Sequence, residues 1–247
     1  MRRAVANPLS PFQASHVEWD EAPPEVELEV QEIEARSILS KNTSPDIAFT
    51  YSLNPYQGCF HGCIYCYARP THQYLQLGAG TDFERKLFVK TNAPELLREA
   101  FGKRTWTGEA ITFSGNTDCY QPLEAKYGLT RRCLEVCLQH RNPVAIITRG
   151  GVILRDVDLI TELHEKVGAR VFVSITFLDD AMRKKVEPYA APIEKRFEVL
   201  RRLSERGVPT GVSVSPLIPG LNDSDLPGIL ERAKECGATE AFLVMLR

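Results

Sequence analysis

The stretch "VAIITRGGVILRDVDLITELHEKVGARVFVSIT", residues 144–176, decides the fold class, because it places an amphipathic segment between two apolar runs. The runs at 144–148 and 171–176 are rich in Val and Ile and are typical of strands buried in a parallel sheet. Residues 155–167 carry charged side chains on one side of a helical repeat. The stretch therefore predicts a strand–helix–strand unit with a right-handed crossover.

The same pattern continues in both directions along the chain. Further strands are expected at residues 47–53, 110–114, 210–216 and 241–246, and further helices at 129–140, 192–206 and 224–236. Six strands at such intervals suit either a doubly wound open sheet or a partial α/β barrel, and in both folds ligands bind at the carboxyl ends of the strands. Small polar residues follow these strands, as a ligand site would require. Helix capping is an alternative explanation, because the same residue types are favoured where a strand turns into a helix.

Composition limits the class of protein. The 247 residues include 30 basic and 32 acidic side chains, so the formal charge of −2 provides no general positive field for nucleic acid or anionic membranes. No apolar run is long enough to span a membrane, and none follows the basic N-terminal residues. We expect a soluble, cytoplasmic protein with no membrane partner. The seven cysteines are odd in number and unevenly spaced, which favours metal binding or catalysis over a disulfide framework.

The chain divides into an extension and a main domain. Residues 1–44 include the acidic segment "EWDEAPPEVELEVQEIEAR" (18–36), which shows no sustained helical or strand period. We expect this extension to be partly irregular and to lie over a domain at residues 45–247. The sixth strand ends the sequence without a helix to cover it, so we expect the domain to be truncated there and the chain to be a fragment of a longer protein.

A loop of cysteines follows the first predicted strand. In "GCFHGCIYCYARP" (58–70), Cys59, Cys63 and Cys66 fall within eight positions. A structural zinc site or an ordinary iron–sulfur cluster needs a fourth protein ligand, which His61 or His72 would supply, so a non-catalytic iron–sulfur or zinc-binding module remains an alternative. Three thiolates in one tight loop also fit three corners of a cubane whose fourth iron stays open to an outside ligand.

This loop resembles the signature of a known superfamily. The spacing Cys59-x3-Cys63-x2-Cys66, with Tyr65 before the last cysteine, resembles that of the radical S-adenosylmethionine (radical SAM) enzymes. The segments "SPDIAFTYSLNPYQGCFHGCIYCYARPTH", "TDCYQPLE", "EPYAAPIEKR" and "SPLIPGLND" resemble the branch related to spore photoproduct lyase. The resemblance covers about residues 41–247.

The resemblance implies a fold, two cofactors and a reaction. The fold is a partial (β/α)6 barrel, and the three cysteines hold a 4Fe–4S cluster whose open iron binds S-adenosylmethionine (SAM). One electron then cleaves SAM, and the 5′-deoxyadenosyl radical abstracts hydrogen from a substrate that the sequence does not identify. The branch implies lyase-like chemistry, a one-electron donor of the flavodoxin or ferredoxin type, and nucleic acid among the substrate classes.

The resemblance also implies which residues contact SAM. Tyr65 is expected to lie against adenine, Thr117 to contact the methionine moiety, and Arg149 to hold the carboxylate through two parallel hydrogen bonds. Ser174 is expected to reach the ribose or the carboxylate, and Ser215 to lie beside adenine. The Gly-Gly-Glu segment of other branches is absent, so the ligands of the cofactor's amino group stay open, and no residue is assigned to hydrogen transfer.

Four other residues have alternative interpretations. Cys133 and Cys137 lie four apart on a predicted helix and are expected to be core residues rather than ligands of a second metal. Glu187 and Arg196 are expected to form a structural ion pair, with substrate contact as the alternative.

Spore photoproduct lyase returns a hydrogen atom to its substrate from a cysteine near the end of its second strand. Alignment on Thr117 and Asp118 places Gly115 at that position, and the nearest thiol is Cys119, four residues later. We expect Cys119 to be a packing residue, or a donor to a differently placed substrate.

Overall fold

The structure is a computed structural model that describes residues 3–12, 17, 19–45, 47 and 49–246. The parts of the predicted extension and first strand at residues 1–2, 13–16, 18, 46 and 48, and the last residue, 247, lie outside the described residues. No helix among the described residues is long and apolar enough to cross a membrane.

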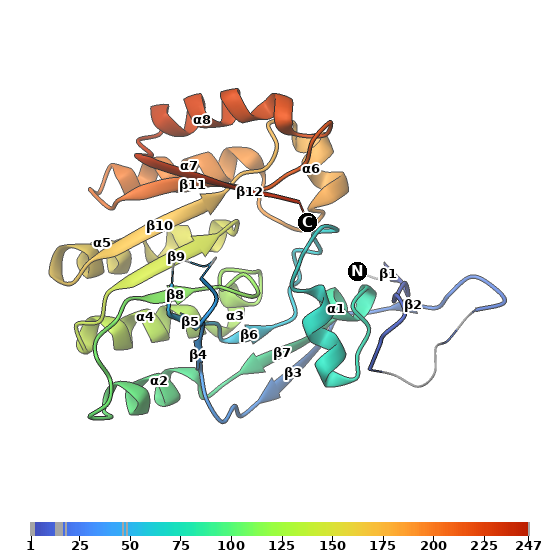
Figure 1. The fold of residues 1–247 in the computed structure, drawn as a ribbon, viewed down its shortest axis with the longest axis horizontal. Helices are drawn as coiled ribbons and strands as arrows, with labels where there is room; N and C mark the ends of the chain where they lie inside the picture. Colours follow the sequence, from blue (N-terminus) through green and yellow to red (C-terminus); the bar gives the residue numbers. More distant parts are fainter. Residues whose placement is uncertain (1–2, 13–16, 18, 46, 48, 247) are drawn as a thin grey trace.

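A seven-stranded sheet forms the centre of the molecule (Figure 1), with the strand order β12-β11-β10-β9-β8-β5-β4. Its strands are β4 (Leu39–Lys41), β5 (Tyr51–Leu53), β8 (Ile111–Phe113), β9 (Val144–Thr148), β10 (Ala169–Ser174), β11 (Thr210–Leu217) and β12 (Glu240–Met245). Neighbouring strands from β5 to β12 are parallel, and β4 is antiparallel to β5. The parallel strands follow sequence order without the reversal of a doubly wound sheet, and the edges stay open. The predicted α/β fold, a partial (β/α)6 barrel, is confirmed.

The first predicted strand is shorter than expected. Strand β5 begins at Tyr51 rather than near residue 47, and it forms an antiparallel hairpin with β4. Within this hairpin, the Asn42 backbone N–H donates to the carbonyl of Thr50 over 2.7 Å, and the Ile47 N–H reaches the carbonyl of Ser44 over 3.4 Å. The apolar residue Ile47 is therefore exposed.

Four helices follow the predicted positions closely: α4 (Leu129–Gln139), α5 (Val157–Lys166), α7 (Ile193–Ser204) and α8 (Leu226–Glu235). Each turns an apolar side toward the sheet, with α5 and α7 against β10 and α8 against β11 (Figure 1). The sequence analysis missed the helices α1 (Thr81–Arg85), α2 (Ala93–Phe101), α3 (Glu124–Tyr127) and α6 (Asp180–Val186), and the 3-10 helices η1 (Arg69–Leu75), η2 (Gly151–Asp156) and η3 (Asp223–Asp225).

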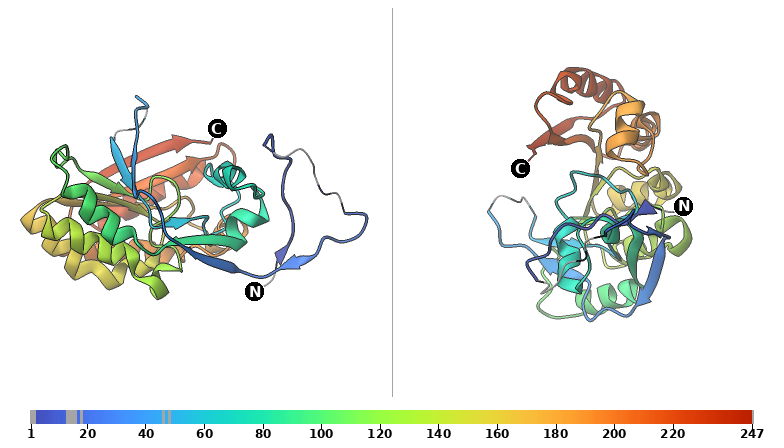
Figure 2. Two further views of the ribbon diagram at one scale, coloured as in Figure 1. Left: turned by 90° about the horizontal axis from the view of Figure 1, so that it is seen from below. Right: turned by 90° about the vertical axis from the view of Figure 1, so that its right-hand side faces the viewer.

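A second, smaller sheet joins the N-terminal segment to the body of the protein. Its order is β3 (Glu29–Ile33), β7 (Lys86–Lys90) and β6 (Tyr56–Gln57), and β3 runs parallel to β7. Two further short strands, β1 (Arg3–Ala4) and β2 (Glu25–Val26), pair with each other. The residues just before β2 project away from the body (Figure 2), whereas Ala6 accepts the Thr81 N–H at 3.0 Å and so lies against α1. The segment predicted as an extension therefore contributes strands to all three sheets, including β4 of the large sheet, and the boundary after residue 44 stays a prediction.

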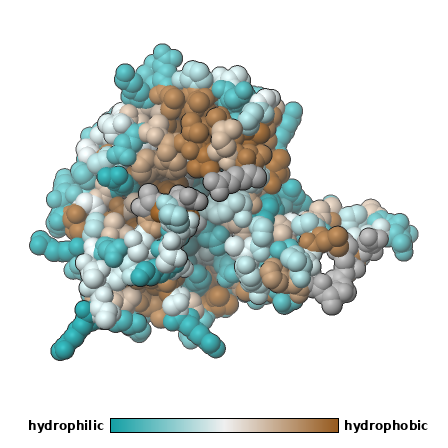
Figure 3. All heavy atoms as spheres, in the orientation of Figure 1, coloured by the Kyte–Doolittle hydropathy of each residue, from teal (hydrophilic) through white to brown (hydrophobic). Residues whose placement is uncertain are grey.

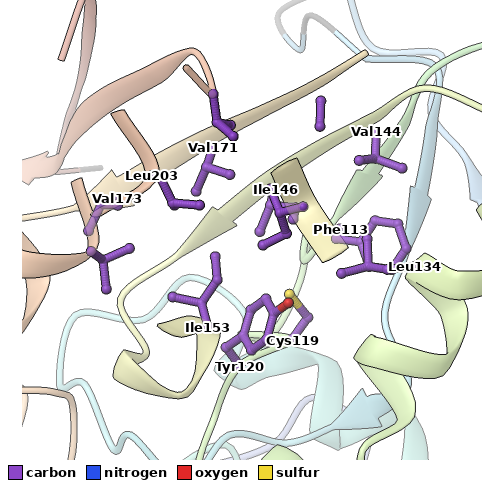
Figure 4. Packing of buried hydrophobic residues seen from close by; sticks show 14 of the residues in the cluster. Phe113, Cys119, Tyr120, Leu134, Val144, Ile146, Ile153, Val171, Val173 and Leu203 are labelled. Atoms are coloured by element: carbon purple, nitrogen blue, oxygen red, sulfur yellow. The ribbon is translucent and has the colours of Figure 1, made fainter. Parts of the chain in front are cut away.

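The main hydrophobic core lies between the large sheet and its helices (Figure 4). Strand residues such as Phe113, Ile146 and Val171 meet helix residues such as Leu134. Fully burying a side chain of this size stabilises the fold by roughly 1.5–3 kcal/mol. The predicted core residues Cys133 and Cys137 are fully buried in this cluster.

Strand β12 is the exception to this packing. It forms one edge of the large sheet, and all six of its residues are exposed. Figure 3 shows the resulting apolar patch over β12. The patch includes Phe242, Leu243, Val244 and Met245.

Candidate functional site

The cysteine loop is a chain of tight turns at the end of β6. The Gly62 N–H approaches the Cys59 carbonyl at 3.4 Å, the Cys66 N–H the Cys63 carbonyl at 3.3 Å, and the Arg69 N–H the Cys66 carbonyl at 3.3 Å. These turns bring three free thiols onto one short loop. Cys59 and Cys63 are buried and Cys66 is half-buried, so the loop encloses two of the sulfurs and leaves the third closer to solvent.

Two glycines let this loop lie directly on α1. Gly58 has a φ of +75° and Gly62 a φ of +67°, a left-handed backbone that favours glycine. A Cβ atom on Gly58 would lie 2.9 Å from the carbonyl oxygen of Phe83, and one on Gly62 would lie 2.7 Å from Oε2 of Glu84. The loop therefore needs glycine both for its turns and for close approach to its neighbours.

The substitution Gly58→Ala should destabilise the protein more than Gly108→Ala. Both positions have positive φ, but a Cβ on Gly108 would meet nothing within 4 Å, whereas one on Gly58 would meet the fixed Phe83 carbonyl. We expect the difference in unfolding free energy to be about 1–3 kcal/mol, the usual penalty for overpacking. Urea denaturation of both variants measures it, and equal losses would contradict the close-approach argument.

Arg69 holds the cysteine loop in place. Its Nε donates to the carbonyl of Cys63 over 2.9 Å, its Nη2 to the carbonyl of Gly62 over 3.1 Å, and its Nη1 to the carbonyl of Gly80 over 2.8 Å. The buried carboxylate of Glu84 pairs with the same guanidinium at 3.1 Å. One arginine thus ties the loop to the start of α1. The sequence analysis missed it, because the three carbonyls that it binds are main-chain groups.

Burial makes Cys59 and Cys63 poor thiolates on their own. It raises the pKa of the Cys59 thiol well above its usual value, with a further contribution from Asp118. Burial also raises the pKa of Cys63 to about 12, although the nearby Arg149 acts in the opposite direction. A bound metal reverses this preference, because thiols deprotonate when they coordinate a metal.

The two histidines considered as fourth ligands lie in different places. His72 is buried with its Nε2 2.8 Å from the carbonyl of Lys86. His61 is also buried, with Nδ1 3.5 Å from Oδ2 of Asp118. Across the described part of the chain, no three Cys, His, Asp or Glu side chains are grouped so that they could hold a metal ion.

A buried carboxylate beside the loop joins three segments that are distant in sequence. Oε1 of Glu187 accepts hydrogen bonds from the Tyr65 hydroxyl, from Thr176 Oγ1, and from Arg149 Nη1 at 2.9 Å. Oε2 accepts from Arg196 Nη2. The predicted ion pair between Glu187 and Arg196 is confirmed, and the structure adds a second cation, Arg149, to the same carboxylate.

These two arginines determine the protonation of the carboxyl group. Burial alone would raise the pKa of Glu187, but Arg196 and Arg149 outweigh it and lower the pKa to about 2. Glu187 is therefore ionised at neutral pH, and its charge holds both guanidinium groups in place.

Arg149 connects this carboxylate to the cysteine loop. Its Nη1 lies 3.4 Å from Sγ of Cys63, and its guanidinium carbon lies 5.6 Å from the centroid of the Tyr65 ring. Asp118 fixes the backbone at Thr148 and Arg149. Its carboxylate accepts hydrogen bonds from the Arg149 backbone N–H at 2.8 Å and from the Thr148 hydroxyl at 2.6 Å. The sequence analysis did not predict this role of Asp118, although an acidic residue just after a strand is a recognisable signal.

Thr117 lies after β8, but its hydroxyl already has protein partners. Its Oγ1 donates to the carbonyl of Tyr56 over 2.9 Å and accepts from Nδ2 of Asn54 over 2.8 Å. The side chain is buried, so it ties the β8 loop to the segment before the cysteines.

The two predicted serines lie on neighbouring strands, Ser174 at the end of β10 and Ser215 in β11. The carbonyl of Ser174 accepts from Arg196 Nη1 at 3.0 Å, which links it to the Glu187 network. Ser215 accepts a hydrogen bond from Ser213 on its own strand at 3.0 Å. The structure thus joins Tyr65, Arg149 and Cys63 through direct contacts. Ser174 reaches them only through Arg196 and Glu187, and the contact of Ser215 stays within its strand.

Comparison with known proteins shows to which family the chain with this arrangement belongs. A sequence model of the Radical SAM superfamily matches residues 53–233, which include the cysteine loop and the strands up to β11. The chain belongs to the radical SAM superfamily. The membership predicted from the cysteine spacing is confirmed.

Two of the relatives of this radical SAM chain are named only as uncharacterized proteins. An uncharacterized protein of Mycobacterium tuberculosis is 34% identical over 211 residues, covering 84% of this chain and 62% of that protein. Another, from Methanocaldococcus jannaschii, is 30% identical over 196 residues, covering 79% of this chain and 70% of that protein. A "Radical SAM Nalpha-GlyT isomerase" of Pseudomonas phage M6 is 25% identical over 185 residues, covering 74% of this chain and 36% of that protein.

The solved structures most informative about this radical SAM fold are those of spore photoproduct lyase. A mutant with bound AdoMet and dinucleoside spore photoproduct superposes with a TM-score of 0.65 at 15% identity, over 88% of this chain and 62% of that one. The radical SAM chain thus spans less than two thirds of the length of this structure and of the mycobacterial relative.

The residues present fit the cluster that radical SAM proteins bind. Three thiols lie on one loop, and a guanidinium contacts one of them. Main-chain turns shape the loop, and glycines at Gly58 and Gly62 let it approach its neighbours. Thiolates that each bind a different iron of a cluster need not converge on one point, as they must around a single ion.

Proposed function

We propose that this protein is a radical SAM enzyme that holds a 4Fe–4S cluster through Cys59, Cys63 and Cys66. When bound, the cluster and SAM supply the 5′-deoxyadenosyl radical, which abstracts hydrogen from the substrate. The observation that carries the proposal is the contact of Arg149 Nη1 with Sγ of Cys63 at 3.4 Å. It places a cation suited to the cofactor carboxylate directly beside a cluster ligand.

The side chains around the loop have separate tasks in this proposal. Arg149 binds the carboxylate of SAM, and Glu187 holds the guanidinium so that its remaining donors face the cofactor. Tyr65 lies beside Arg149 and packs against adenine. Thr117, Ser174 and Ser215 contribute polar contacts from the ends of β8, β10 and β11.

The finer parts of the proposal concern reaction and partners. We propose lyase-like chemistry on a nucleic-acid substrate, supported by the likeness in fold to spore photoproduct lyase with its bound dinucleoside. A flavodoxin or ferredoxin type protein supplies the electron. We place the protein in the cytoplasm, because a site built from free thiols needs a reducing compartment.

Anaerobic reconstitution with iron and sulfide tests the proposed function. We expect four irons per chain, and conversion of SAM to 5′-deoxyadenosine when a strong reductant is added, measured by liquid chromatography. A protein that takes up zinc and excludes iron would contradict the proposal. A protein that loads the cluster but leaves SAM intact would favour the alternative, a non-catalytic module with a histidine as fourth ligand.

The protein should cleave SAM without repairing the spore photoproduct. Gly115 has no side chain, and a Cβ there would lie 2.9 Å from that of Ser52. Cys119 is fully buried in the main core (Figure 4), so its thiol cannot reach a substrate carbon at the contact distance of about 3–3.5 Å that hydrogen transfer requires. An anaerobic assay with dinucleoside spore photoproduct measures repair. Repair by the wild type that is lost in Cys119→Ala would show that this thiol is the donor.

A further inference from the structure

Arg85, the last residue of α1, is a buried cation without an anionic partner. It is fully buried, and among the described residues its one hydrogen-bond partner is the Tyr189 hydroxyl, to which Nη2 donates over 2.7 Å. Its Nε and Nη1 have no hydrogen-bond partner, and no carboxylate pairs with it among the residues that the structure describes. Arg196, buried to the same degree, pairs with Glu187.

Two aromatic rings surround this guanidinium. Its central carbon lies 5.4 Å from the centroid of Phe60 and 4.9 Å from that of Tyr189, and the two ring centroids are 4.9 Å apart. Cation–π contacts with two rings offset only part of the free-energy cost of burying an unpaired ion. The rings alone therefore do not compensate the buried charge.

The same two rings belong to the surroundings of the cysteine loop. Phe60 follows Cys59 in sequence, and the Tyr189 N–H donates to the carbonyl of His61 over 3.1 Å. A Cβ on Gly62 would lie 3.2 Å from Cδ2 of Tyr189. Arg85 thus packs against Phe60, a residue of the cysteine loop, and against Tyr189, which is hydrogen-bonded to that loop.

We propose that the positive charge of Arg85 balances the negative charge of the thiolate-bound cluster. This charge raises the reduction potential of the cluster. The inference rests on the proposed function. One-electron reduction adds a negative charge to a group that already has three thiolate ligands, and a buried cation nearby stabilises that state in a medium of low dielectric constant. The unsatisfied guanidinium becomes compensated when the cluster is present.

Redox titration of the reconstituted protein, followed by electron paramagnetic resonance of the reduced cluster, tests this inference. In Arg85→Met, which removes the charge, we expect the equilibrium constant for reduction to fall about tenfold, a shift of 59 mV to more negative potential for a one-electron couple. Arg85→Lys should keep most of the wild-type potential. Tyr189→Phe, the matched control, removes the hydrogen bond to Arg85 but no charge and should leave the potential unchanged.

Iron content, measured for every variant, separates the outcomes. A fully loaded Arg85→Met with the wild-type potential would overturn the inference, and so would equal shifts in Arg85→Met and Arg85→Lys. If only the lysine variant loads the cluster, the positive charge is required and the inference is supported; if neither loads, Arg85 acts through its shape and the inference is wrong. A wild-type protein that takes up no iron would instead overturn the proposed function, and this inference with it.

Discussion

Cys63→Ala should take up no stable cluster and should produce no 5′-deoxyadenosine above background. Removing an outer hydrogen-bond partner of a metal ligand typically costs roughly 10–100-fold in metal affinity or activity, and removing a ligand should cost more. Cys63 also contacts Arg149, so its loss removes one of the links between the loop and the Glu187 network, while the Tyr65 hydroxyl keeps another. Iron analysis and SAM cleavage, both under anaerobic conditions, measure the effect.

Cys137→Ala is the matched control for this experiment. Its thiol is fully buried as well, but it lies on α4 in the main core. It should lose some unfolding free energy through a small cavity and keep its full iron content. Equal iron loss in both variants would show that general damage, rather than loss of a ligand, explains the result for Cys63.

Glu187→Gln should lower the unfolding free energy by about 3–5 kcal/mol, because removing one partner of a buried ion pair leaves the other charge uncompensated. Here two cations, Arg196 and Arg149, depend on the same carboxylate. The control is Glu194→Gln, whose ion pair with Arg232 lies on the surface and should contribute less than about 1 kcal/mol. Denaturant titrations of both variants at neutral pH compare the losses, and similar small losses would contradict the buried-pair argument.

The pH dependence of stability gives a second readout for Glu187. Its pKa falls from the usual 4.5 to about 2 in the folded protein. A carboxyl group with a lowered pKa stabilises the fold above the unfolded-state pKa, and this contribution is lost as pH falls toward the folded-state pKa. Between about pH 5 and pH 2 the wild type should therefore lose stability more steeply than Glu187→Gln. Parallel curves would show that the carboxylate is not held in its ionised form.

The order of the large sheet follows from sequence patterns that are local. Each buried run and each amphipathic helix can be seen in a window of ten to fifteen residues, and parallel strands joined by helices leave few topologies. The smaller sheet could not be predicted in this way. Its strand β3 is acidic and mostly exposed, and only its pairing with β7 from a distant part of the chain makes it a strand. Long-range pairing of this kind leaves no period in the sequence.

The candidate site shows the same difference between local features, which the sequence predicts, and long-range contacts, which it does not. Cysteine spacing predicted the metal ligands, because a tight loop concentrates three cysteines within a few positions. The pairing of Glu187 with Arg196 was predicted from their proximity on one segment, but the attachment of Arg149 and Tyr65 to the same carboxylate was not. Arg85 carried no sequence signal, since an arginine at the end of a short helix is ordinarily a solvated residue.

The strand order of the large sheet also determines how the protein assembles on the ribosome. From β5 to β12 each parallel strand pairs with the one made just before it, so every strand that emerges meets a partner already in place. Glu187 is made 121 residues after Cys66, roughly 6–24 s later at 5–20 residues per second. During that interval the nascent cysteine loop lacks the carboxylate network that later surrounds it. Cys63 therefore stays without its contact to the Arg149–Glu187 pair until that part of the chain has been made.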